Sequence, residues 1–110
     1  MSGWFELKPA VGGQFMFNLK AGNGKVILTS ELYKAKQSAK KGITSVKNNS
    51  PNDGRYDRQT ASNGEKYFEL KAGSGESVGI SELYTGPSGM EKGIAAVKKA
   101  APGGTIKDRT

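Results

Sequence analysis

Residues 17–24 read Phe-Asn-Leu-Lys-Ala-Gly-Asn-Gly, and the pattern returns at residues 68–75 as Phe-Glu-Leu-Lys-Ala-Gly-Ser-Gly. Two further blocks recur at the same spacing of 51 residues (from 17 to 68): Ser-Glu-Leu-Tyr at 30–33 and 81–84, and Lys-Gly-Ile at 41–43 and 92–94. Blocks that keep one ungapped offset indicate a tandem duplication of one supersecondary unit. We therefore predict a single domain over residues 1–110, with repeat one at 4–54 and repeat two at 55–110.

The hydrophobic pattern within each repeat predicts three strands followed by a helix. In the second strand, Phe17 and Leu19 alternate with polar neighbours, and Phe68 and Leu70 repeat this period of two. After the third strand the period becomes helical. The helical stripe is Ala35, Ala39, Ile43 and Val46 in repeat one, and Met90, Ile94 and Val97 in repeat two. The predicted fold class is α+β: one antiparallel sheet of about seven strands with two helices packed on one face.

Three local features add detail to this prediction. Ser88 and Glu91 have the spacing of a capping box, which predicts the start of the second helix. Gly42 and Gly93 interrupt helix interiors, where glycine is unfavourable, and indicate close approach of each helix to the sheet. Residues 106–109 match the start of repeat two, so we predict a lone terminal strand that pairs at the sheet edge near Phe5.

The composition excludes several kinds of chemistry. The chain contains neither cysteine nor histidine, which excludes disulfides, zinc sites and nucleophile–histidine pairs. We predict no catalytic residue, no metal site and no cofactor. An enzyme would have to work with serine, tyrosine, lysine and carboxylates alone. We also expect a cytoplasmic protein without a membrane contact, because no stretch is apolar enough to cross a bilayer and the N-terminus does not read as a secretory signal.

The positive charge is unevenly distributed. The formal net charge is +7, and residues 1–50 hold eight lysines against Glu6 and Glu31, whereas residues 51–110 hold nine basic against eight acidic residues. Such a basic half either meets a polyanion or keeps the protein in solution.

The repeated Ser-Glu-Leu-Tyr segment is a candidate polar cluster, whose members are Ser30, Glu31, Tyr33, Ser81, Glu82 and Tyr84. In a functional interpretation it forms two symmetry-related binding sites. In a structural interpretation, Leu32 and Tyr33 pack under the helix, while Ser30 or Glu31 holds loop backbone N–H groups.

A second candidate site is the sheet face that the helices leave open. Strand alternation predicts aromatic and basic residues on this face, and the candidate binding residues are Trp4, Lys20, Arg55, Tyr67 and Lys71. Aromatic rings among cations are typical of surfaces that bind single-stranded nucleic acid. Acidic residues on the same face, such as Glu6 and Glu69, weaken this positive field.

The blocks at 19–24, 30–33 and 42–47 resemble those of the YegP-like family, small bacterial proteins without a known activity. The resemblance covers nearly the whole chain, twice. It implies β-β-β-α-β repeats in one sheet, with the strand after each helix exchanged onto the other repeat. We expect a monomer, because the two repeats complete each other. The function predicted is a non-catalytic interaction or structural module with an unknown partner; weak, sequence-tolerant nucleic-acid binding and a histidine-free enzyme are the alternatives.

Overall fold

The computed structural model describes residues 3–110. Seven strands and two α-helices follow the order of the two repeats. Their bounds are β1 Gly3–Pro9, β2 Phe15–Ala21, β3 Val26–Thr29, α1 Lys36–Asn49, β4 Tyr56–Thr60, β5 Lys66–Lys71, β6 Ser77–Ile80, α2 Pro87–Ala100 and β7 Thr105–Asp108. Short 3-10 turns at Val11–Gly13 and Asp53–Arg55 lie before β2 and β4.

All seven strands belong to one sheet in the order β4-β5-β6-β3-β2-β1-β7. The α+β prediction is confirmed, and so is the pairing of the terminal strand near Phe5, which lies opposite Ile106. One detail differs: β7 runs parallel to β1, so the sheet is mixed. The reason is the position of α2, whose last residue Ala100 lies against Gly3 at the start of β1. The strand that leaves α2 therefore begins where β1 begins and runs the same way.

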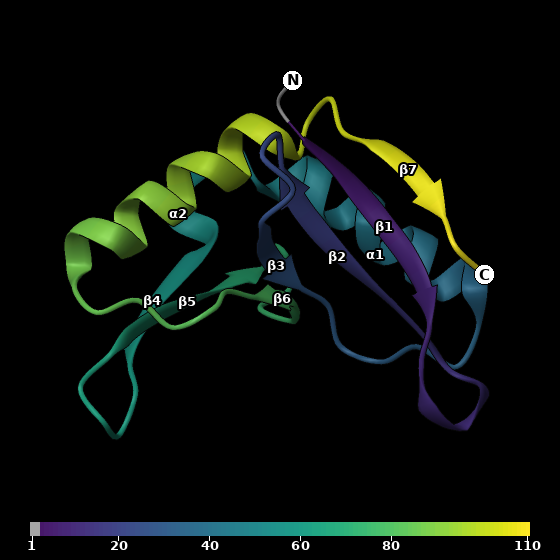
Figure 1. Ribbon diagram of the computed structural model, residues 1–110, viewed down its shortest axis with the longest axis horizontal. Helices are drawn as coiled ribbons and strands as arrows, with labels where there is room; N and C mark the ends of the chain where they lie inside the picture. The colour runs from purple at the N-terminus through teal and green to yellow at the C-terminus, as the bar shows by residue number, and fades with distance from the viewer. Residues whose placement is uncertain (1–2) are drawn as a thin grey trace.

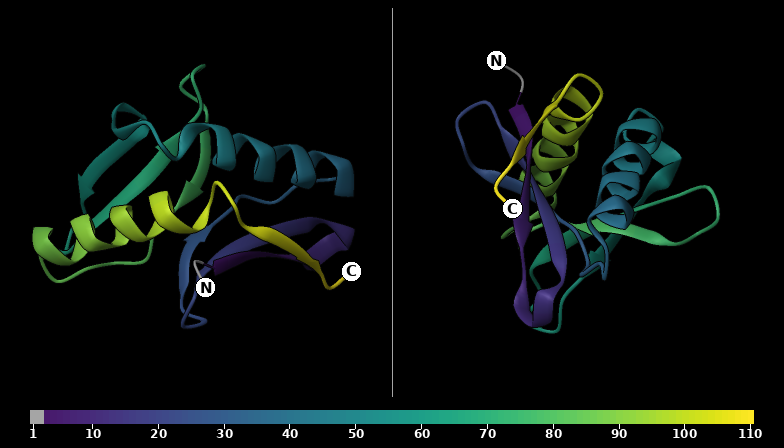
Figure 2. Two further views of the ribbon diagram at one scale, coloured as in Figure 1. Left: turned by 90° about the horizontal axis from the view of Figure 1, so that it is seen from above. Right: turned by 90° about the vertical axis from the view of Figure 1, so that its right-hand side faces the viewer.

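The sheet consists of two halves that meet at a narrow junction. Half one is β1, β2, β3 and β7, and half two is β4, β5 and β6; between β3 and β6, Thr29 pairs with Ile80. Figure 1 shows β1 and β2 in front of α1, but β4 and β5 behind α2, and the two views of Figure 2 agree with this arrangement. The sheet thus wraps around the helix pair, and the outer surfaces of its two halves point in opposite directions.

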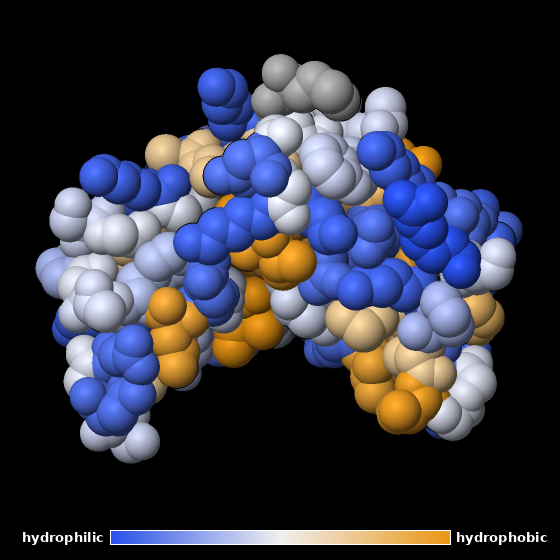
Figure 3. Space-filling view, viewed as in Figure 1, coloured by the Kyte–Doolittle hydropathy of each residue, from blue (hydrophilic) through white to orange (hydrophobic). Residues whose placement is uncertain are grey.

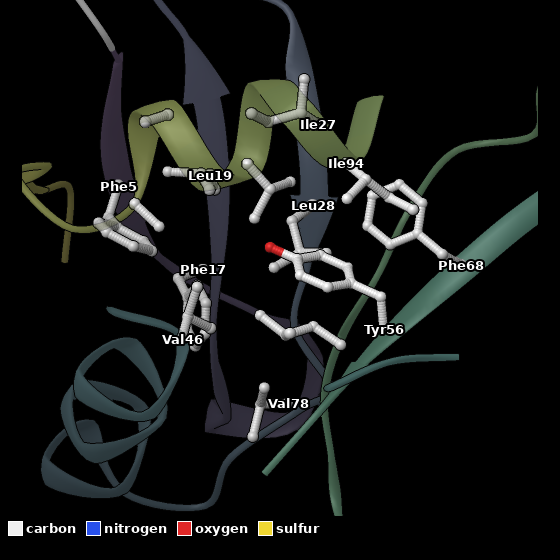
Figure 4. Packing of buried hydrophobic residues seen from close by; sticks show 14 of the residues in the cluster. Phe5, Phe17, Leu19, Ile27, Leu28, Val46, Tyr56, Phe68, Val78 and Ile94 are labelled. Carbon is white, nitrogen blue, oxygen red and sulfur yellow. The ribbon is translucent and has the colours of Figure 1, made fainter. Parts of the chain in front are cut away.

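One hydrophobic core joins the repeats. Phe17 and Phe68 are both fully buried, as the alternation predicts, and helix residues such as Val46 and Ile94 pack against them (Figure 4). Each repeat contributes a matching set of three aromatic rings to this region. The rings are Phe5, Phe17 and Tyr33 in repeat one, and Tyr56, Phe68 and Tyr84 in repeat two. The two halves are therefore built alike and share their interior.

The predicted capping box is wrong. Helix α2 begins at Pro87, one residue before Ser88, and its N-cap Gly86 has extended backbone without a side-chain cap. Proline suits the first turn because its missing N–H would find no partner inside the helix. Ser88 therefore lies within the helix, and Glu91 accepts hydrogen bonds from Arg58 of β4 instead, at 2.6 and 3.0 Å.

The two α-helices are shorter than a membrane-spanning helix. Both helices have 14 residues. Within residues 3–110 no helix is long and apolar enough to span a bilayer.

Candidate functional site

The Ser-Glu-Leu-Tyr segments leave the ends of β3 and β6 in the same way. The Phe17 N–H donates to the hydroxyl of Ser30 at 2.9 Å, and that hydroxyl donates to the carbonyl of Glu31 at 2.8 Å. Ser81 makes the same two bonds, at 2.9 and 2.8 Å, to Phe68 and Glu82. Both serines therefore bind backbone groups where the strand ladder is interrupted, which is the structural role considered from the sequence.

Tyr33 and Tyr84 end these segments and turn toward the helices. Tyr33 stacks on Phe17 with ring centroids 6.2 Å apart, and Tyr84 stacks on Phe68 at 6.5 Å. Each ring crosses a helix at a glycine, because a Cβ on Gly42 would stand 2.9 Å from Cζ of Tyr33, and one on Gly93 would stand 2.6 Å from Cζ of Tyr84. The close approach predicted at these glycines thus involves the tyrosines that leave β3 and β6.

The other members of the segment face outward. Glu31 and Glu82 are exposed, and Glu82 pairs with Lys25 at 3.5 Å. Leu32 was expected to pack under the helix, but it is 46% exposed, and its counterpart Leu83 is 49% exposed. The reason is the backbone pairing of Tyr33 with Phe15, which directs Tyr33 inward and leaves the residue before it on the outside.

A cleft of about 330 Å³ lies between Tyr84, helix α2 and the β2–β3 hairpin. We call it the Tyr84 cleft. Its lining residues are Ala21, Asn23, Lys25 and Ile27 from the hairpin, Glu82 and Tyr84, and Gly89, Lys92, Gly93 and Ala96 from α2. Figure 3 shows this side of the molecule, with apolar surface between hydrophilic side chains near the hairpin.

A second cleft, of about 240 Å³, lies between Tyr33, helix α1 and the β5–β6 hairpin. We call it the Tyr33 cleft. Its lining residues are Tyr33, Ser38, Lys41, Gly42 and Ser45, with Ala72, Ser74, Glu76 and Val78 from the hairpin. Every one of these residues has its counterpart, 51 positions away, in the Tyr84 cleft. Each cleft therefore combines the helix and tyrosine of one repeat with the hairpin of the other.

The tyrosine hydroxyls are the central polar groups of the clefts. Among residues 3–110 the Tyr56 and Tyr67 hydroxyls have hydrogen-bond partners, whereas the Tyr33 and Tyr84 hydroxyls have none. Burial raises the pKa of both phenols, and nearby carboxylates (Glu31 and Glu76 for Tyr33, Glu82 for Tyr84) raise it further. At neutral pH the hydroxyls therefore keep their protons and act as hydrogen-bond donors.

The two clefts differ in charge. The Tyr84 cleft has Lys25 and Lys92 against Glu82, whereas the Tyr33 cleft has Lys41 against Glu76. Counting the lining side chains gives +1 for the first and zero for the second. The difference arises at two pairs of equivalent positions. The hairpins carry Lys25 and Glu76 at one pair, and at the other pair Glu82 lines its cleft whereas Glu31 does not.

The open-face candidates do not form one surface. Trp4 and Lys20 belong to half one, whereas Tyr67 and Lys71 belong to half two, whose outer surface points the opposite way (Figure 2). Arg55 lies in the 3-10 turn that leads into β4 of half two.

Several of the open-face groups also have partners within the protein. Lys107 lies 4.3 Å from the centroid of the Trp4 ring, Lys20 lies 3.4 Å from Glu6, and the Arg55 Nε donates to Asn49 at 3.2 Å. The Tyr67 hydroxyl donates to Gln59 at 2.6 Å.

Within residues 3–110 no group of three or more carboxylates could hold a metal ion.

Sequence reasoning identified the tyrosines of the clefts but missed their other walls. Lys41 and Lys92 lie inside the repeated Lys-Gly-Ile block, and the hairpin residues lie inside the repeated turn. The repeats could have drawn attention to both. Only the tertiary structure, however, brings the hairpin of one repeat against the helix of the other.

Fold and clefts define the class of protein: a tandem-repeat α+β protein with two equivalent clefts. Comparison with known proteins places it more closely. The family model described as a domain of unknown function, DUF1508, matches residues 10–57 and again residues 61–108. The UPF0339 protein YegP of Escherichia coli K12 is 53% identical over all 110 residues of both chains. A UPF0339 protein of Bordetella pertussis is 54% identical over the whole chain and 98% of the relative.

Two solution NMR structures share the fold. The E. coli yegP structure matches with a TM-score of 0.95 at 53% identity, covering 100% of this chain and 95% of the other. The structure of a UPF0339 protein from Shewanella oneidensis matches with a TM-score of 0.92 at 47% identity, covering 98% and 92%. The chain therefore belongs to the YegP-like family of bacterial proteins and carries the DUF1508 domain twice.

Proposed function

We propose that this protein is a non-catalytic binding module that holds a small organic ligand in each of its two clefts. The observation that carries the proposal is the equivalence of the clefts. Both repeats place a hydroxyl without a protein partner, a helix lysine and a glycine backbone around a cleft. The larger cleft, of about 330 Å³, reaches the lower end of the volumes usual for small-molecule sites.

Binding explains the polar groups better than catalysis does. A tyrosine that serves as a general base needs a lowered pKa, but burial raises the pKa of Tyr33 and Tyr84. Lysine and one carboxylate complete each lining, without a second carboxylate to share acid and base roles. These groups are suited to recognising a ligand by hydrogen bonds and charge.

Amide chemical-shift mapping with a diverse library of small organic fragments tests this proposal. We expect fragments to shift the amides of residues 23–25 and 89–96 at one cleft, and of residues 74–76 and 38–45 at the other. Fragments that bind only elsewhere, or that leave both clefts unperturbed at millimolar concentration, would contradict it. Tyr84→Phe, which removes only the hydroxyl, is expected to weaken polar fragments at the Tyr84 cleft and leave the Tyr33 cleft unchanged.

Nucleic-acid binding remains the second candidate because of one observation. Lys8, Lys20 and Arg109 gather around Glu6 beside Trp4, with distances to the Glu6 carboxylate of 3.8, 3.4 and 3.5 Å. These contacts neutralise part of the positive charge, so any binding should be weak and salt-dependent. In the same NMR experiment, a single-stranded oligonucleotide at low salt would shift amides of β1 and β2 if this candidate were right.

Two further properties are proposals. The shared core supports a monomer, since each repeat is completed by the other. A cytoplasmic location is inferred from the composition, and cell fractionation would test it.

A further inference from the structure

We propose that the Tyr84 cleft selects an organic anion with a flat apolar body, and that the Tyr33 cleft does not. This inference rests on the proposed function and names the ligand class of one of its two sites.

The apolar part of the ligand is defined by the walls of the Tyr84 cleft. Gly89 and Gly93 lie one helical turn apart on the helix wall of the cleft, with Gly93 buried under the Tyr84 ring and Gly89 partly exposed beside it. Ala21, Ile27 and Ala96 complete an apolar surface beside the Tyr84 ring. A flat ring or a short chain fits such a surface, because it gains hydrophobic contact without having to displace a side chain.

The anionic part is defined by the charged groups at the rim. Lys25 and Lys92 face a single carboxylate, Glu82, which pairs with Lys25 at 3.5 Å. Within residues 3–110 no carboxylate lies within 4.0 Å of the Lys92 ammonium group. The protonated Tyr84 hydroxyl adds a neutral donor. The two lysine charges therefore exceed the single negative charge of Glu82. A ligand carboxylate or phosphate would supply the missing negative charge and accept a hydrogen bond from the Tyr84 hydroxyl.

The lining of the Tyr33 cleft can be compared with that of the Tyr84 cleft in the same molecule. It keeps the tyrosine, the glycine and the helix lysine, but Glu76 replaces Lys25. Ser38 and Ser45 also replace Gly89 and Ala96, so its helix wall is more polar. An anion that entered this cleft would meet the carboxylate of Glu76 beside Lys41. The two repeats therefore keep one architecture and differ in the charge of the ligand they accept.

The test compares probes of one shape and different charge. Benzoate, phenyl phosphate, neutral benzamide and cationic benzamidine are titrated separately into the isotope-labelled protein while cleft amides are followed. We expect both anions to bind the Tyr84 cleft about tenfold more tightly than benzamide, as a rim charge at a few ångströms would give. Comparison of benzoate with phenyl phosphate shows which anionic group is preferred. Added salt should reduce this preference.

Two matched charge reversals identify the cause. Lys25 has 61% of its side chain exposed, and Glu76 is also exposed, so neither substitution should disturb the fold. Lys25→Glu is expected to weaken benzoate at the Tyr84 cleft about tenfold while benzamide binding stays the same. Glu76→Lys is expected to strengthen benzoate at the Tyr33 cleft by a similar factor.

The outcomes separate this inference from the proposed function. If benzamide bound the Tyr84 cleft as tightly as benzoate, or if neither reversal changed benzoate binding, anion selection would be wrong although binding in the clefts would stand. If no probe and no library fragment reached either cleft, both proposals would be wrong.

Discussion

At positions 42 and 93 the fold uses glycine inside a helix, where alanine is more favourable by about 1 kcal/mol. The gain is contact with an aromatic ring. Tyr33 and Tyr84 pass so close to the helix backbone that a methyl group would overlap the phenol. The same glycine also lines the cleft beside its tyrosine. One small residue therefore serves both the packing of the core and the shape of the candidate site.

Gly93→Ala is expected to destabilise the protein by about 1–3 kcal/mol, because the overlap with Tyr84 outweighs the better helix propensity of alanine. The free energy of unfolding in urea measures the effect. Gly89→Ala in the same helix is the control: its Cβ would stand 3.4 Å from Tyr84, an ordinary contact. This control should be neutral or up to about 1 kcal/mol more stable. Equal stabilities for the two variants would show that the ring does not require the glycine.

A buried tyrosine of β4 binds the backbone at the end of α1. The Tyr56 hydroxyl donates to the carbonyl of Ser50 at 2.8 Å, just after the last turn of α1. Burial raises the pKa of Tyr56 above its ordinary value, and the charge of Asp53 adds to the effect. A phenol whose pKa is higher in the folded state favours folding fully below its unfolded pKa, and this contribution is lost as the pH rises above that value.

Tyr56→Phe should therefore cost about 1 kcal/mol at pH 7, through the lost hydrogen bond to Ser50. Above about pH 10 the unfolded tyrosine ionises, which lowers the free energy of unfolding of the wild type. The variant has no phenol at position 56 and therefore lacks this loss. Unfolding free energies at pH 7 and pH 11 test this expectation. The difference between the two proteins should shrink at the higher pH; a constant difference would contradict the assignment.

The first strands of the two repeats, β1 and β4, show how one repeat position changes role with its surroundings. Leu7 in β1 is fully buried, because β7 continues the sheet beside it. Its counterpart in β4 is Arg58, at the uncovered edge, where it binds Glu91 and Asp53 at 2.6 and 3.1 Å. Charged side chains on an edge discourage pairing with other chains. On the opposite edge, Lys36 of α1 holds Asp108 of β7 at 2.6 Å.

The whole molecule has an approximate twofold symmetry that must break where the two halves meet. Leu28 and Gly79 are equivalent positions on β3 and β6, and both face the core at the junction. A Cβ on Gly79 would stand 2.6 Å from Cγ of Leu28. The interior at this point holds one leucine, and the second repeat provides space for it by having no side chain. Figure 4 shows Leu28 among side chains of both repeats.

Leu28→Ala is expected to cost about 2–5 kcal/mol through the cavity it leaves, and Gly79→Leu should also destabilise, by overpacking. The exchange variant, Leu28→Gly with Gly79→Leu, keeps one leucine at the junction. The exchange variant should lose less free energy of unfolding than Leu28→Gly and Gly79→Leu lose together. Unfolding free energies of these two single variants and the exchange variant form a double-mutant cycle with the wild type. Additive losses would show that the two positions do not share one space.

Much of the fold could be predicted from the sequence, because its signals are local. The alternation of Phe17 and Leu19 and the helical stripe ending at Val46 each follow from a period within a few residues. The direction of β7, the start of α2 and the exposure of Leu32 were not predicted correctly. The first and the last depend on contacts with residues distant in the sequence, Gly3 beside Ala100 and Phe15 beside Tyr33. The start of α2 follows instead from Pro87, which suits the first helical turn.

The candidate site divides in the same way. By itself, the sequence determined that the protein is a duplication, that Tyr33 and Tyr84 are equivalent, and that each repeat has a helix with a central glycine. Only the tertiary structure decided which hairpin completes each cleft, and so placed Lys25 near Tyr84 and Glu76 near Tyr33. The physical reason is that hydrophobic periodicity acts along a single strand or helix, whereas a cleft is formed by segments that meet only when the two repeats bury their common core.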